Sequence, residues 1–596
     1  MTTYTAPIDD MKFVLYDFLG IDKYSNLPGF EDASPDIVSA ILDEAGKMAS
    51  EVLHPINHSG DQEGCTWNDG VVTTPSGFKE AYDLYRESGW QALTSTPDYG
   101  GQGLPQVLGL AVSEMMIAAN WGFGMYPGLT KGAAEALEAH GSEELKNKYL
   151  PNMIEGKWSG TMNLTEPHCG TDLGMIRTKA EPQDDGTFRI TGTKIFISAG
   201  EHDLTENILH LVLAKIPGGP EGTKGISLFL VPKVLVNDDG SLGERNGVSC
   251  GSIEHKMGIH SNATCVMNYD NAVGYLVGEE HKGMPAMFTM MNEARLGVGM
   301  QGLGIAEVSY QNAVTYARER IQGRSISGAK SPDTAADPII VHPDVRKMLM
   351  TGRAFTEGAR ALAGMTGLNI DLSHRHPDED VRQKADDFVA LMTPVVKAYF
   401  TDMGVEVASQ SLQIYGGHGY IAEHGMEQFL RDARIAPIYE GTNGIQALDL
   451  VGRKLAQNGG RAVQAFFAEV QQFANENKDD AAIGKHAAEL GRVAGQLQQA
   501  TMWLMQHGMA NPDNAGAAST DYLKLMALTA FAYVWAMAAK TANAKLSNGA
   551  DNKPFYENKL TTAQFFFDRI LPETDSLLRK IEAGGDSMMA MPAEAF

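Results

Sequence analysis

The spacing of apolar residues changes twice along this chain, and this change constrains the fold more than any other feature. Up to about residue 160 the spacing is helical. The residues that carry it are Ile37, Ile41, Ala45, Met48 and Val52 on one face, and Phe78, Tyr82 and Tyr85 on another. Over Gly160–His281 it gives way to alternation, as in Phe188–Ile197, and to short apolar runs at Leu209–Ala214 and Ile226–Val231. Helical spacing then returns. The pattern predicts an α+β fold, mainly α, with a small β domain between helical blocks.

Length and composition indicate several packed domains. A chain of 596 residues exceeds what one hydrophobic core supports. Apolar residues make up 43% and charged residues 20%, which is ordinary for a soluble globular protein. We expect a helical domain over 1–160, a β domain over 161–281, a helical bundle over 282–458 and a further helical domain over 459–596. In the bundle, small residues would let neighbouring helices approach closely; they are Gly297, Gly299, Gly302 and Gly304.

Charge and cysteine content argue against several classes of function. The formal net charge is −26, from 48 basic and 74 acidic residues, which disfavours binding to a nucleic-acid backbone. The four cysteines have no CxxC spacing, so neither a disulfide framework nor a metal site is expected; they are Cys65, Cys169, Cys250 and Cys265. Met1–Asp10 lacks the pattern of a signal peptide, and no run of about eighteen apolar residues is evident. We therefore expect a cytoplasmic protein without a membrane span.

The segment Gln413–Arg453 combines glycine turns with the start of a helix. It contains a Gly-Gly-His-Gly turn at 416–419, a Tyr-Glu-Gly-Thr segment at 439–442, and helically spaced Ile445, Leu448 and Val451. Thr442 or Asn443 is a suitable N-cap, so a helix should begin there. Glu440 then lies in the loop before that helix, beside Gly441, which allows a ligand to come close. Two roles fit its carboxylate: a base acting on a bound ligand, or a charge that complements the helix dipole.

This segment resembles the active-site signature of the acyl-CoA dehydrogenases, flavoproteins that oxidise the Cα–Cβ bond of an acyl-CoA thioester. Glu440 follows Gly417 at the family's spacing, so the resemblance implies that Glu440 is the catalytic base. It also implies that Gly441 contacts the substrate and Thr442 the FAD cofactor. The fold implied is that of the family: an N-terminal helical domain, a middle β-barrel-like domain and a C-terminal four-helix bundle, here followed by an extra C-terminal helical domain.

Two motifs in the β domain, Leu164–Asp172 and Phe196–Gly200, resemble the family's flavin-contacting segments. By this resemblance, Thr165 would hydrogen-bond the pyrimidine side of the isoalloxazine ring. Phe196 would pack on the flavin, and Ser198 would reach its N5 edge. An aromatic wall and hydroxyl donors suit a ring that becomes negatively charged when reduced.

The first of these motifs also implies a substrate contact, and each of the two motifs departs from the family in one place. Thr171 would lie where the acyl-CoA enters. The family commonly has Gly-Ala/Ser-Gly where this chain has His168-Cys169-Gly170, and commonly Trp where it has Phe196. His168 has no recognisable partner in the sequence, so we expect it to have a structural or rim position.

Two arginines and a second glycine turn resemble further ligand contacts of the family. Arg295 would lie near the substrate entrance, and Arg320 would bind the FAD pyrophosphate of a neighbouring subunit, since a guanidinium fork suits a diphosphate. Gln413 and the Gly416-Gly417 turn would reach the same FAD. The resemblance therefore implies a homodimer or a dimer of dimers.

The chain departs from the family directly after Arg320. The usual Phe-Gly is replaced by Ile321-Gln322-Gly323. A stretch rich in Gly, Ser, Asp and Pro follows over Ser325–Asp344, which predicts an extended loop.

Within the family, the chain most resembles enzymes that oxidise 3-(methylthio)propanoyl-CoA to 3-(methylthio)acryloyl-CoA in dimethylsulfoniopropionate demethylation. The shared segments are Asn163–Ala180, Gly323–Lys330 and Pro437–Lys454. The resemblance implies that Glu440 takes the α-proton, that flavin N5 takes the β-hydride, and that electron-transferring flavoprotein reoxidises the FAD. Dehydrogenases of short-, medium- or long-chain fatty acyl-CoA and an acyl-CoA oxidase-like enzyme are alternatives. A DNA-binding flavoprotein relative is a remote one, because residues 456–596 carry no dense Lys/Arg cluster.

Overall fold

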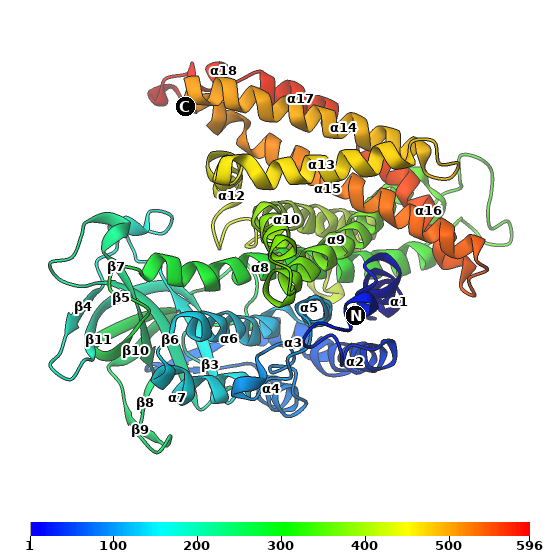
Figure 1. Ribbon diagram of the computed structural model, residues 1–596. Helices are drawn as coiled ribbons and strands as arrows, with labels where there is room; N and C mark the ends of the chain where they lie inside the picture. Colours follow the sequence, from blue (N-terminus) through cyan, green and yellow to red (C-terminus); the bar gives the residue numbers. More distant parts are fainter. Residues whose placement is uncertain (1) are drawn as a thin grey trace. The chain divides into compact units, whose positions relative to one another are not determined.

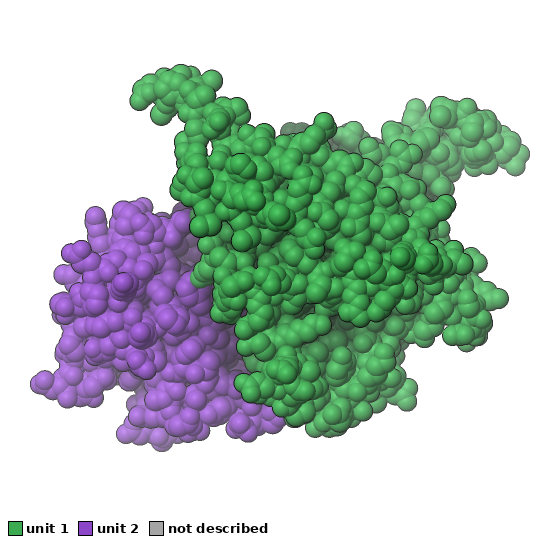
Figure 2. Space-filling model, turned by 45° about the horizontal axis from the view of Figure 1, so that its top comes forward, with its two compact units in different colours: residues 1–43, 105–114, 298–596 green, residues 44–104, 115–297 purple. Residues whose placement is uncertain are grey.

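The computed structural model describes residues 2–596 (Figure 1), which form two compact units (Figure 2). Unit 1 comprises the residues up to 43 together with 105–114 and 298–596, and unit 2 comprises 44–104 and 115–297. Three of the four boundaries fall inside helices, namely α2 (Pro35–Lys47), α5 (Gln106–Ala119) and α8 (Gly283–Glu319), and the fourth lies directly before α5.

The strands of unit 2 form a seven-stranded sheet that closes into a ring. Its strands are β3 (Trp158–Asn163), β4 (Lys179–Pro182), β5 (Phe188–Ser198), β6 (Asn207–Lys215), β7 (Ile226–Pro232), β10 (Val248–Ile253) and β11 (Thr264–Val277). The order is β10-β11-β5-β4-β6-β3, and β7 pairs with both β6 and β11. This last pairing closes β11, β5, β4, β6 and β7 into a barrel. The pairs β3–β6 and β4–β6 are parallel, and the others are antiparallel.

Side-chain burial in the sheet follows the sequence pattern. Strand β5 alternates up to Lys194, whereas β6 and β7 are buried on both faces, which explains their continuous apolar runs. Helices α6 (Trp121–His140) and α7 (Glu143–Ile154) share a buried cluster with the sheet. The Thr130 hydroxyl of α6 accepts a hydrogen bond from the Gly160 amide at 3.1 Å. The predicted β domain is confirmed.

Unit 2 also holds two short hairpins and two further helices. They are β1 (Thr66–Asn68) with β2 (Val71–Thr73), β8 (Val234–Val236) with β9 (Leu242–Arg245), α3 (Asn57–Glu63) and α4 (Phe78–Glu87). The Trp67 indole of the first hairpin donates to the Cys250 carbonyl of β10 at 3.0 Å. Phe78, Tyr82 and Tyr85 are buried along one face of α4, as predicted.

Unit 1 is helical. Its helices, besides the parts of those named above, are α1 (Ile8–Lys12), α9 (Pro343–Arg375), α10 (Glu379–Tyr415), α11 (Met426–Ala433), α12 (Asn443–Asp449), α13 (Arg461–Asn477), α14 (Gly484–Trp503), α15 (Pro512–Ser547), α16 (Lys553–Phe565), α17 (Glu573–Glu582) and α18 (Asp586–Met589). Helix α8 approaches α10 closely at Gly299 and Gly302, where a β-carbon would overlap Val396 and the Phe400 carbonyl. Gly297, by contrast, meets nothing within 4 Å, so only part of the predicted glycine face serves close packing.

A buried ionic cluster joins five helices of unit 1. Arg360 on α9 pairs with Glu114 on α5 at 2.6 Å, with Glu307 on α8 at 2.9 Å, and with Asp10 on α1. Lys559 on α16 pairs with Asp10 and, at 2.8 Å, with Glu357 on α9; all six side chains are at most 11% exposed. Burial raises the pKa of Glu114 to about 7 despite the guanidinium beside it.

Within residues 2–596, α15 is the one helix that is long and apolar enough to cross a membrane. The sequence reading overlooked it. Its most apolar eighteen-residue window is 89% buried inside the protein, which is also what the core helix of a globular domain shows.

The segment between α8 and α9 forms an extended loop, as predicted, with one buried carboxylate at its centre. Asp337 accepts hydrogen bonds from the backbone amides of Ser325 at 2.9 Å, Lys330 at 3.0 Å and Ser331 at 2.7 Å, and from Arg324 at 3.2 Å. These donors, the Ser325 amide first, lower the pKa of Asp337 to about 2.

The predicted face that begins in α2 is partly right. Ala45 and Met48 are buried as predicted, but Ile37 is exposed and Ile41 is only half-buried, while Val38 and Leu42 face the core. Both sets have helical spacing, so periodicity alone could not choose between them.

Candidate active site

In unit 2, the Thr165 turn is fastened to strand β5 directly before Phe196. The Thr165 carbonyl accepts a hydrogen bond from the Ile195 amide at 2.9 Å. The Lys194 ammonium donates to the Leu164 carbonyl at 3.0 Å. The two segments that the sequence reading assigned to the flavin therefore lie side by side.

A buried ion pair supports this turn. Glu166 accepts from Lys194 at 2.9 Å, from the Arg177 amide at 2.6 Å, and from the amide and hydroxyl of Thr178 at 3.0 and 2.6 Å. Burial opposes the charge on both Glu166 and Lys194. On Glu166, Lys194 and the other donors outweigh burial and hold its pKa below the usual value. On Lys194 burial prevails, and its pKa is lowered.

Phe196 is held in a strained and exposed conformation. Ile197 pairs with Cys265 and Lys194 with Met267, so a β-bulge leaves Ile195 and Phe196 opposite a single residue of β11. Phe196 has φ of +58°, which is unfavourable for a bulky side chain, and it is 59% exposed. An exposed aromatic side chain in a conformation that the fold must enforce makes Phe196 a candidate functional position.

The residues around Phe196 fit an isoalloxazine ring. Ser198 is half-buried two residues along β5, and Thr165 is half-buried on the adjoining turn. An exposed aromatic face with hydroxyl groups on neighbouring segments matches what a flat, partly polar ring requires. Thr171 is exposed further along the same loop, in keeping with a rim position.

Arg295 is buried. It is 6% exposed, donates to the Asn292 side chain at 3.5 Å, and lies 5.9 Å from the centre of the Phe288 ring. Arg295 is therefore not a solvent-exposed arginine on the surface of α8.

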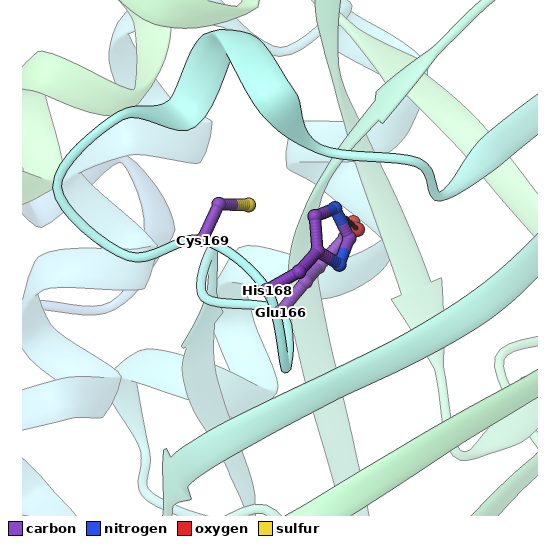
Figure 3. A group of neighbouring side chains, drawn as sticks. All are labelled: Glu166, His168 and Cys169. Carbon is purple, nitrogen blue, oxygen red and sulfur yellow. Dashed lines mark ion pairs between the residues drawn. The ribbon is translucent and has the colours of Figure 1, made fainter.

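Glu166, His168 and Cys169 come close enough together to suggest a metal site (Figure 3). Their hydrogen bonds argue against one. The His168 Nε2 lies 2.9 Å from the Met175 carbonyl and must carry a proton to donate to it. Both Glu166 oxygens already accept hydrogen bonds. Burial raises the pKa of the Cys169 thiol and so keeps it protonated.

In unit 1, Glu440 lies in a tight turn directly before α12. Thr442 is the N-cap and accepts from the Ile445 amide at 3.2 Å, as predicted. Glu440 has φ of +55° and Gly441 has φ of +82°. The Gln446 side chain donates to the Glu440 carbonyl at 3.1 Å. The turn presents a half-buried carboxylate in a conformation that a glutamate rarely adopts.

The other sequence-predicted residues of unit 1 occupy an exposed region. Arg320, Gln413, Gly416 and Gly417 are all exposed. Tyr316, near the end of α8, stacks on Tyr415 with ring centres 4.1 Å apart, and its hydroxyl lies 2.8 Å from the His418 Nδ1. These contacts hold the end of α8, directly before Arg320, beside the Gly416-Gly417 turn.

Four residues that hold the turns of Thr165 and Glu440 in place were not predicted from the sequence. They are Glu166, Lys194, Gln446 and, on α10, Lys397, whose ammonium donates to the Gly441 carbonyl at 2.8 Å. All four are buried and polar, and three lie within or near the quoted motifs, but nothing in the sequence distinguishes them from solvated residues.

Comparison with known proteins identifies the family. Four family models match in chain order: the acyl-CoA dehydrogenase N-terminal domain at 38–157, its middle domain at 161–272, its C-terminal domain at 281–456, and the acetyl-CoA dehydrogenase C-terminal-like domain at 466–592. A 3-methylmercaptopropionyl-CoA dehydrogenase of Ruegeria pomeroyi is 44% identical over 98% of this chain and 99% of its own. The chain belongs to the acyl-CoA dehydrogenase family.

Other relatives agree with this assignment. A broad-specificity linear acyl-CoA dehydrogenase of Mycobacterium tuberculosis is 34% identical over 100% of both chains. The crystal structure of an acyl-CoA dehydrogenase complexed with FAD from Bacillus anthracis has a TM-score of 0.74 at 21% identity, covering 96% of this chain and 91% of that one. The predicted family and fold are confirmed, including the extra C-terminal helical domain. The protein is an FAD-dependent oxidoreductase of the acyl-CoA dehydrogenase type.

Proposed function

We propose that this protein oxidises 3-(methylthio)propanoyl-CoA, also called 3-methylmercaptopropionyl-CoA, to 3-(methylthio)acryloyl-CoA. The observation that carries the proposal is the 44% identity, over almost the full length of both chains, to the Ruegeria pomeroyi enzyme of that name. The two strained positions, Phe196 and Glu440, support it because each presents the group that the reaction needs.

Glu440 is the proposed base that removes the α-proton of the thioester. The Gln446 contact fixes the carbonyl of the same residue, so the carboxylate is presented from an ordered turn. Gly441 leaves room for the thioester beside the base, and Thr171 and Arg295 are the proposed contacts for the rest of the acyl-CoA. Bound FAD supplies the acceptor for the β-hydride.

Residues from two subunits are proposed to hold FAD. Phe196 would pack on the isoalloxazine ring, while Thr165 and Ser198 would donate hydrogen bonds to it. From the partner subunit, the proposed contacts are Arg320, Gln413, Gly416 and Gly417, and Thr442 is a further proposed FAD contact. The exposure of the four residues supports contacts outside their own subunit. We therefore propose a homodimer or a dimer of dimers, located in the cytoplasm, with electron-transferring flavoprotein as the electron acceptor.

A substrate panel tests the proposal. Purified protein loaded with FAD is mixed anaerobically with 3-(methylthio)propanoyl-CoA, butanoyl-CoA or octanoyl-CoA, and loss of the flavin absorbance is followed. The highest ratio of flavin-reduction rate constant to substrate dissociation constant is expected for the thioether substrate. Equal or faster oxidation of the straight-chain substrates would refute the thioether preference while leaving the dehydrogenase assignment intact.

A straight-chain dehydrogenase is the second candidate. A butyryl-CoA dehydrogenase of Syntrophomonas wolfei is 34% identical over 100% of this chain and 99% of its own. The same panel decides between the two. Oxygen consumption during turnover separates both from an oxidase-like enzyme.

A further inference from the structure

The turn that carries Glu440 contains two successive residues in the left-handed region. Glu440 has φ of +55° and Gly441 has φ of +82°. A glutamate enters this region only where surrounding contacts enforce it. Gly441 itself cannot be replaced without conflict, because a β-carbon would come within 2.7 Å of the Gln446 amide nitrogen.

Two fully buried side chains bind the carbonyls of these two residues. Gln446 donates from its amide nitrogen to the Glu440 carbonyl at 3.1 Å. Lys397, on helix α10, donates from its ammonium to the Gly441 carbonyl at 2.8 Å. Lys397 lies on α10 and Gln446 lies on α12, so two helices hold the turn in place.

Hydrogen bonds through Asn443, which directly follows Thr442, orient the Lys397 side chain. Its ammonium donates to the Asn443 side-chain oxygen at 2.8 Å. The Asn443 amide donates in turn to Asp402 at 2.7 Å and to the Ala398 carbonyl at 3.1 Å. By accepting from the Asn443 amide, Asp402 orients the side chain whose oxygen accepts from the Lys397 ammonium.

We propose that Lys397 and Gln446 are positioning residues that hold Glu440 in its reactive orientation. This inference rests on the proposed function of Glu440 as the base. Without the two donors, the left-handed turn loses the contacts that enforce it, and the carboxylate moves away from the α-carbon. A displacement of about 1 Å in such a group lowers a rate by roughly 10²-fold.

The test measures proton removal separately from hydride transfer. In a 3-thia-acyl-CoA, sulfur replaces the β-carbon, so the α-protons can exchange with D2O but no β-hydride can leave. Mass spectrometry follows the exchange with FAD-loaded wild-type protein, Lys397→Met, Gln446→Met and Lys384→Met. Lys384 is the matched control, because it lies on the same helix, is 65% exposed and pairs with Glu469 at the surface. Glu440→Gln and an enzyme-free sample set the background.

We expect Lys397→Met to lower the exchange rate about 10²-fold and Gln446→Met to lower it about tenfold or more. The dissociation constant of the analogue, read from flavin spectral perturbation, should change by less than threefold in both. A merely structural role would instead lower FAD content and ligand affinity together. Lys384→Met should behave as wild type in every measurement.

Wild-type exchange in Lys397→Met and in Gln446→Met would overturn the proposal. If Lys397→Met does not fold, Gln446→Met decides alone, since it removes a neutral donor and no charge. Parallel loss of exchange and ligand affinity would also overturn it. Failure of the wild-type protein to exchange α-protons or oxidise any acyl-CoA would refute the proposed function instead.

Discussion

Replacing Lys559 by methionine should destabilise unit 1 by about 3–5 kcal/mol, the usual cost of removing one partner from a buried ion pair. The Lys559 side chain is 2% exposed and pairs with Asp10 and Glu357. Methionine has a similar length and fills the same space, but it loses the ion pairs and the cation–π contacts of the ammonium, which lies 5.0 Å from the centre of the Phe13 ring. The loss therefore reports the removed charge and not a cavity.

The destabilisation should depend on pH in a defined direction. Burial raises the pKa of Asp10, but Lys559 and Arg360 outweigh it and hold the pKa below the ordinary 3.8. In wild type, this carboxylate stabilises the fold above about pH 4, and the contribution is lost as pH falls through the folded pKa. Without Lys559 the pKa of Asp10 in the folded state rises. Acidification therefore lowers the free energy of unfolding of the variant less than that of wild type. The difference in unfolding free energy should narrow between pH 7 and pH 4.

Urea unfolding followed by tryptophan fluorescence measures this difference, because Trp535 lies 5.8 Å from the Lys559 ammonium. Lys524→Met is the matched control: Lys524 pairs with Glu573 at 2.6 Å, but the two side chains are 39% and 42% exposed, so the expected cost is about 0–1 kcal/mol. A Lys559→Met cost below about 1 kcal/mol, or a cost that does not change with pH, would refute the reasoning.

Three further predictions concern the site and the helix packing. Glu440→Gln should bind FAD and acyl-CoA but lose about 10²–10⁴-fold or more in flavin reduction, measured by stopped flow; a tenth of the wild-type rate would mean that another group is the base. Phe196→Ala should weaken FAD binding about tenfold in a fluorescence titration of the apoprotein, because stacked aromatic rings contribute about 0.5–1.5 kcal/mol, and unchanged affinity would contradict the stacking role. Gly302→Ala should destabilise unit 1 by about 1–3 kcal/mol in urea unfolding, because the new methyl group overlaps the Phe400 carbonyl. Gly297→Ala on the same helix should not destabilise, and equal effects of the two would rule out close packing as the cause.

The sequence predicted the secondary-structure elements whose formation depends on neighbouring residues, such as a strand with alternating side chains or a helix with a capping residue. The alternation of Phe188–Ile197 predicted β5, and the capping preference of Thr442 predicted where α12 begins. The position of Glu440 before that helix followed from the cap. The resemblance to the acyl-CoA dehydrogenases then supplied the roles, which spacing alone could not.

Features that depend on distant parts of the chain were not predictable. The left-handed conformations of Phe196 and Glu440 are imposed by a bulge against β11 and by buried donors, and no local preference signals them. The ionic cluster joins Asp10 to Arg360 and to Lys559, which are 350 and 549 residues away in sequence. Burial of Arg295 is likewise a tertiary effect.

The closed ring of strands in unit 2 also bears on how this protein avoids aggregation. A sheet edge offers unpaired amides and carbonyls to which another chain can add a strand. Ring closure gives β4, β5, β6, β7 and β11 neighbours on both sides, so the outermost strands are β3 and β10. On β10, the Trp67 indole occupies the Cys250 carbonyl. A change as small as Trp67→Phe would free that carbonyl, and an increased tendency of the protein to self-associate through β10 is the expected consequence.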